Sequence, residues 1–115
     1  MQIQVHTHHT AGDDDFTGRV EATVAAGLAR FAAHLMRVEI HLEDVNAGKG
    51  GAADKRCVIE ARPTHHQPVA VTHHAATIPL ALDGAIEKAR RALDKALAAR
   101  TDHKGAASVR DNDLR

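Results

Sequence analysis

Residues 20–42 read VEATVAAGLARFAAHLMRVEIHL, and the spacing of their apolar side chains changes near the end. At about 100° per residue, the apolar positions of the first part form one stripe along a helix: Val20, Val24, Leu28, Phe31 and Leu35. From Val38 to Leu42 apolar and polar residues alternate, which is the period of a strand with one buried face. The stretch therefore predicts a helix from about Thr17 to Leu35 or Met36, followed by a strand.

The segments on either side predict three more strands. Ile3 and Val5 alternate with polar residues within residues 1–10, and short strand-like runs return in residues 55–62 and 69–72. The glycine-rich segment 46–54, between the second and third strands, is predicted to be a mobile hairpin loop.

A second helix is predicted to begin at Thr77 and to run to about Arg100. Threonine can cap the free amide groups of a first helical turn, and Pro79 in that turn has no amide hydrogen to satisfy. The element order is then βαβββα. It predicts an α+β fold of two layers, in which a four-stranded mixed sheet carries both helices on one face. The first helix forms a crossover connection between the first and second strands, so these two strands pair in parallel.

Length and composition limit the class of protein. A chain of 115 residues suits one domain, predicted here to span residues 1–104, with residues 105–115 as a disordered tail. The single Cys57 cannot form an internal disulfide, and no run reaches the roughly 20 apolar residues that a membrane span needs. Because no signal-peptide pattern opens the chain, we expect a cytoplasmic protein without a membrane partner.

Catalytic motifs are missing from the sequence. It contains no G-x-S-x-G elbow, no P-loop and no G-x-G-x-x-G, and the short run from Gly48 to Gly51 lacks the Gly-Lys-Ser/Thr ending that a phosphate loop requires. Cys57 alternates within a predicted strand, as a packing residue would. We therefore expect no enzyme, no cofactor and no small-molecule substrate.

Basic residues give the first functional signal, because the formal charge is zero, with 15 Lys plus Arg against 15 Asp plus Glu. A basic surface can therefore arise only where the basic residues are separated in space from the acidic ones. In the second helix one exposed stripe holds Lys88, Arg91 and Lys95, and in the first helix Arg19 and Arg30 share a face that Arg37 would extend if the helix reached it. These six residues are the candidates for RNA binding. The alternative is an ordinary solvated helix surface, with Glu87 paired to Arg91.

The ten histidines give the second signal. His6, His8 and His41 lie on predicted strands and should face the side of the sheet that the helices leave open, where neighbouring strands can bring imidazoles together. The sequence shows no cysteine or carboxylate that completes a ligand set, and an open polar sheet face also explains these residues. No metal site is assigned to them, although a histidine-rich metal-binding or protein-interaction module stays as the alternative function.

Residues 77–93, TIPLALDGAIEKARRAL, resemble the second helix of the ribosome hibernation-promoting and ribosome-associated inhibitor family. Thr77 takes the capping position, Leu82-Asp83 matches an Ile-Asp pair, and Lys88 and Arg91 match a basic pair. Weaker matches lie in residues 1–5, at Arg19 and Arg30, and in residues 103–105. Ile78-Pro79 stands where the family usually has Met-Tyr, and the histidines have no counterpart in the motif.

The resemblance implies a domain similar to double-stranded RNA-binding domains. It implies binding to ribosomal RNA of the small subunit, in the channel for messenger and transfer RNA, and stabilisation of inactive ribosomes during stress or stationary phase. The chain resembles the short form of the family, which lacks a second, dimerising domain. A monomer is compatible with this resemblance, and the sequence leaves the oligomeric state open.

Overall fold

A computed structural model describes residues 1–8, 14–45 and 55–105 of the chain. The elements in chain order are β1 (Gln2–His8), α1 (Asp14–Gly27), the 3₁₀ helix η1 (Ala29–His34), β2 (Leu35–Asp44), β3 (Lys55–Pro63), β4 (Val69–Ala75) and α2 (Ile78–Gly105). The strands form one sheet in the order β1-β2-β3-β4. β1 runs parallel to β2, as the sequence predicts, and the β2–β3 and β3–β4 pairs are antiparallel.

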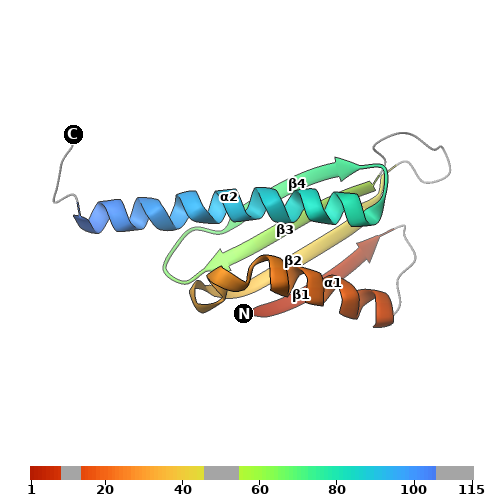
Figure 1. Cartoon of the computed structure of the whole chain (residues 1–115), viewed down its shortest axis with the longest axis horizontal. Helices are drawn as coiled ribbons and strands as arrows, with labels where there is room; N and C mark the ends of the chain where they lie inside the picture. Colours follow the sequence, from red (N-terminus) through yellow and green to blue (C-terminus); the bar gives the residue numbers. More distant parts are fainter. Residues whose placement is uncertain (9–13, 46–54, 106–115) are drawn as a thin grey trace.

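Both helices lie on the same face of this sheet (Figure 1). α2 packs over β3 and β4, and α1 lies beside it over β1 and β2. The α+β fold of two layers, with a four-stranded mixed sheet, is therefore confirmed. The opposite face of the sheet carries no helix in the described part of the chain.

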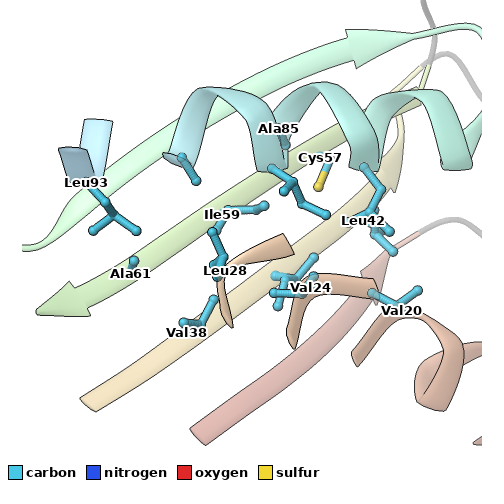
Figure 2. Packing of buried hydrophobic residues seen from close by; sticks show 14 of the residues in the cluster. Val20, Val24, Leu28, Val38, Leu42, Cys57, Ile59, Ala61, Ala85 and Leu93 are labelled. Carbon is cyan, nitrogen blue, oxygen red and sulfur yellow. The ribbon is translucent and has the colours of Figure 1, made fainter. Parts of the chain in front are cut away.

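The core lies between the two layers and is aliphatic (Figure 2). Every apolar residue of the predicted stripe, from Val20 to Leu35, is buried. The sheet contributes its inward-facing side chains, among them Val38, Ile40, Leu42 and Ile59, and α2 contributes Ala85 and Leu93 among others. Burial raises the pKa of the Cys57 thiol to about 12, so a reactive thiolate does not form near neutral pH, and the prediction of a packing role is confirmed.

The first helix differs from its prediction at both ends. It begins at Asp14, three residues before Thr17, and the α-helix ends at Gly27 instead of Leu35. A Cβ on Gly27 would lie 2.6 Å from Cγ2 of Ile86, so the two helices are in close contact where α1 ends. The chain then continues as η1, whose tighter turn still directs Phe31 into the core. Periodicity alone did not reveal this change of winding, because the buried stripe is unbroken.

The second helix begins as predicted and ends later. The Leu80 amide donates a hydrogen bond to Oγ1 of Thr77 at 3.2 Å, which is the expected cap. The helix continues to Gly105, five residues beyond Arg100. Once started, a helix propagates until a breaking residue, and Gly105 is the first glycine after Gly84. The 28 residues of α2 give a length of roughly 42 Å, and its last turns extend past the sheet (Figure 1).

The predicted loop 46–54 lies outside the described residues, as does most of the predicted tail, from residue 106 on. The domain limits of residues 1–104 therefore stay a prediction. In the part of the chain that the structure describes, no helix is long and apolar enough to cross a membrane.

The contact between Gly27 and Ile86 generates a stability prediction. Gly27→Ala adds a methyl group where a branched core side chain already lies, and we expect it to lower the free energy of unfolding by about 1–3 kcal/mol. Ile86→Leu removes the clashing Cγ2, so the double variant should recover part of the loss. Urea unfolding of the four proteins measures both effects. A Gly27→Ala variant as stable as the parent, or no coupling with Ile86→Leu, would contradict the packing described here.

Candidate functional site

The exposed surface of α2 is divided by charge into two flanks. Lys88, Arg91 and Lys95 are exposed and fall within a sector of roughly 60° around the helix axis, which we call the basic flank. Nζ of Lys88 donates a hydrogen bond to the backbone oxygen of Thr72 at 2.8 Å. Because Thr72 belongs to β4, the basic flank lies on the side of α2 that faces this edge strand.

A glycine brings α2 close to β4 on this side. A Cβ on Gly84 would lie 2.1 Å from Cδ2 of His73, so the imidazole packs directly against the helix backbone. Glycine inside a helix costs about 1 kcal/mol relative to alanine, and here the close approach requires it. The position of the basic flank above β4 is therefore set by packing.

The other flank of α2 faces α1 and η1 and is acidic. It contains three exposed carboxylates, Asp83, Glu87 and Asp94, together with the half-buried Arg90. Arg30 reaches it from η1, and its two terminal nitrogens donate hydrogen bonds of 2.7 Å to the two carboxylate oxygens of Asp94. Glu87 pairs at 3.7 Å with Arg90, not with Arg91 as the solvated-surface alternative supposed.

The ion pair between Arg30 and Asp94 is bidentate, and both side chains are exposed. The hydrogen bonds from Arg30 hold the pKa of the Asp94 carboxyl below its ordinary value, and the same bonds raise the pKa of Arg30. The Arg30 guanidinium also lies 4.3 Å from the centroid of the Phe31 ring. Of the predicted basic residues, Arg30 is thus already engaged by a carboxylate.

Arg19 lies on α1, at a groove between the two helices. This groove has a volume of about 270 Å³ and is lined by Phe16, Arg19, Val20, Thr23, Ile78, Pro79, Leu82 and Asp83. Since α1 ends at Gly27, Arg19 and Arg30 do not belong to one continuous helix, although both are exposed. The mostly apolar groove presents one cation and one carboxylate.

Arg37 does not extend the face of the first helix, so that expectation is wrong. The chain has already entered β2 at Leu35, and a register shift between Leu35 and Arg37 turns Arg37 to the open face of the sheet. There its Nη2 donates a hydrogen bond of 2.7 Å to Oε1 of Gln4, and its Nε lies 3.1 Å from Oε2 of Glu39. Arg37 therefore lies on the opposite layer from the basic flank.

Two of the three predicted histidines do meet on the open face. His6 of β1 and His41 of β2 are paired in register, and their rings stack with centroids 4.7 Å apart. The expectation that no carboxylate completes a set is wrong, because Glu39 lies beside both rings and forms with them a possible metal-binding group. We call His6, Glu39 and His41 the histidine cluster. His8 is exposed, with its ring centroid 6.1 Å from that of His41, and is outside the cluster.

Sequence reasoning missed Glu39 although part of the signal was visible. Glu39 and His41 alternate on one face of their strand. What the sequence does not give is the register of β1 against β2, which places His6 opposite His41 and Gln4 opposite Glu39.

The comparisons with known proteins agree with this fold. The model of the family described as "Sigma 54 modulation protein / S30EA ribosomal protein" matches residues 3–101. The crystal structure of the Thermus thermophilus Protein Y N-terminal domain superposes with a TM-score of 0.59 over 76% of this chain and 90% of that one. The two are 22% identical, so this likeness shows the fold alone. No curated protein matches the chain.

The pairing of Arg30 with Asp94 generates a pH prediction. A carboxyl whose pKa is lowered on folding contributes stability that is present above its ordinary pKa of 3.8 and is lost as the pH falls through the folded value. Titration of the Asp94 carboxyl carbon by NMR should give a midpoint below 3.8, and Arg30→Gln should return it toward 3.8. Identical midpoints in the two proteins would show that the pair is not formed in solution.

Proposed function

The chain belongs to the sigma 54 modulation protein / S30EA ribosomal protein family, and from this premise we propose that it is a ribosome-associated hibernation factor. The family model matches residues 3–101, a range that takes in all four strands and both helices apart from Gln2 and the last turn of α2. The protein then acts by binding and not by catalysis. Its place of action is the cytoplasm, where ribosomes are found.

We propose further that the partner is ribosomal RNA of the small subunit, contacted through the basic flank. Phosphate groups dominate the affinity of proteins for RNA, and a chain of zero formal charge can meet them only where its cations are separated from its carboxylates. Among the described residues, no carboxylate forms an ion pair with Lys88, Arg91 or Lys95. This unpaired row of three cations is the observation that carries the proposal.

The remaining candidate cations differ in what they offer such an interface. Arg19 is exposed on the same layer and can add a contact from α1. Arg30 has to exchange Asp94 for a phosphate, and the acidic flank around Asp94 repels RNA. Arg37 lies on the other face of the sheet, so we place it outside the interface. The RNA is therefore expected along the β4 side of α2.

Binding in the channel for messenger and transfer RNA would keep both ligands off the ribosome. A domain bound there as a monomer needs no substrate or cofactor to stabilise idle ribosomes during stress or stationary phase. The alternative of a metal-binding or protein-interaction module is favoured by one observation, the histidine cluster. That cluster lies on the opposite layer from the basic flank, so the two functions do not compete for one surface.

A charge-removal experiment tests the RNA interface. Replacing Lys88, Arg91 and Lys95 together by Gln should weaken binding to purified small subunits and reduce the slope of log affinity against log salt by up to about three units. The fold should persist, because exposed surface substitutions usually change stability by less than about 0.5 kcal/mol each. Equilibrium binding across a salt series measures affinity and slope, and circular dichroism checks the fold.

A matched control separates this surface from charge in general. Arg62 is exposed on β3, and Arg37 lies opposite it in register on the open face. Arg62→Gln removes the same charge as Arg91→Gln but should leave affinity and slope close to the parent values. If the folded triple variant binds as the parent does, or if Arg62→Gln weakens binding as much as Arg91→Gln, the basic flank is only a solvated surface.

A further inference from the structure

We propose that the histidine cluster, His6, Glu39 and His41, binds one divalent transition-metal ion such as Zn²⁺ on the open face of the sheet. Two imidazoles and one carboxylate are a known ligand set for zinc. The proposal is independent of ribosome binding, because it concerns the opposite layer of the molecule.

Strand pairing builds the cluster from two segments that are far apart in the sequence. β1 and β2 are parallel and in register, with His6 opposite His41, so both side chains leave the same face at neighbouring positions. Glu39 stands two residues before His41 and therefore shares that face. One position of β1 and two positions of β2 thus bring three potential ligands together without any loop.

The ligand atoms already lie near the separations that a metal ion requires. Tetrahedral zinc with bonds of about 2.0–2.1 Å holds its ligand atoms roughly 3.3–3.4 Å apart. Nε2 of His6 lies 3.4 Å from Oε1 of Glu39, and Nε2 of His41 lies 3.9 Å from the same oxygen. All three ligand atoms lie within 4.8 Å of one another. The two rings are stacked at 14° to each other, so binding requires them to rotate until both nitrogens point at one ion.

One ligand atom lacks any other partner. Nε2 of His6 is inaccessible to solvent and has no hydrogen bond, although 40% of the side chain is exposed. A buried polar atom without a partner is costly, and coordination of an ion would satisfy it. The nitrogen is therefore directed into the cluster and not toward water.

The carboxylate is oriented by its other neighbour. Nε of Arg37 lies 3.1 Å from Oε2 of Glu39, which leaves Oε1 directed at the two imidazoles. Gln4, opposite Glu39 in register, accepts a hydrogen bond from Arg37 and fixes its position. Outer partners of this kind hold a metal ligand in place. The positive charge of Arg37 repels a bound cation. The negative charge of Glu60, which lies opposite Glu39 on β3, compensates for this repulsion.

The chemistry of the set determines the class of ion. Imidazole nitrogen favours zinc, copper, nickel and cobalt, whereas Mg²⁺ prefers oxygen ligands alone. Cys57 cannot contribute, because it is buried on the helix side of the sheet. Three protein ligands on a partly exposed face leave a coordination position to water. The bound ion would join the edge strand β1 to β2 and so stabilise the folded chain.

Calorimetric titration of the full chain with Zn²⁺, after treatment with a chelator, tests the site. We expect one Zn²⁺ site that depends on the cluster, an increase in melting temperature on adding Zn²⁺, and no effect of Mg²⁺ at the same concentration. His6→Gln, Glu39→Gln and His41→Gln should each weaken this site at least about tenfold. Circular dichroism shows that each variant is folded, and Co²⁺ absorption spectra report the coordination geometry independently.

The matched control is His74→Gln. His74 is exposed on the same face of the sheet, opposite Arg56 in the register, and lies outside the cluster. The substitution His74→Gln should therefore leave the affinity of the protein for Zn²⁺ unchanged. The proposal is overturned if the parent protein does not bind Zn²⁺, if the folded cluster variants bind it as the parent does, or if His74→Gln weakens it equally. In those cases Glu39 serves only as an ion-pair partner of Arg37 beside the two histidines.

Discussion

The alternation of side chains along β2 is the constraint on which the rest of the structure depends. Val38, Ile40 and Leu42 point to the helices and are fully buried, whereas the residues between them point the other way. β2 pairs with a strand on each side, and a shift by one residue would expose this apolar row. Its register therefore fixes which face the helices cover and which face keeps polar side chains such as Glu39 and His41.

The close packing of α2 against α1 and β4 then determines which of its charged side chains face each of these two elements. The approach of Gly27 to Ile86 sets α1 against α2, and that of Gly84 to His73 sets α2 against β4. The two contacts hold α2 in one rotation about its own axis. Its acidic flank consequently faces Arg30 of η1, and its basic flank faces outward above the edge strand. Among the described residues, this neutral chain thus presents a row of three cations without an ion-pair partner, because the nearby carboxylates pair with Arg30 and Arg90 instead.

Much of this could be predicted from the sequence, because periodicity and capping are local properties. The order of elements, the buried stripe, the cap at Thr77 and the exposure of the basic flank all follow from residues within a few turns of one another. Contacts between distant segments could not be predicted. Arg30 pairs with Asp94, 64 residues away, and the register of β1 on β2 brings His6 to Glu39. Arg37 would have extended the face of the first helix only if that helix reached it, and the chain instead enters β2 at Leu35, with a register shift before Arg37.

The orientation of α2 on the ribosome is the central claim, and chemical footprinting measures it most directly. Amine-specific and guanidine-specific reagents, followed by mass spectrometry, compare each side chain in the free protein and in its complex with small subunits. Lys88, Arg91 and Lys95 should lose reactivity in the complex, while Arg62 on the open face keeps it. Protection of Arg62 with unchanged reactivity of the three basic-flank residues would contradict the proposed orientation.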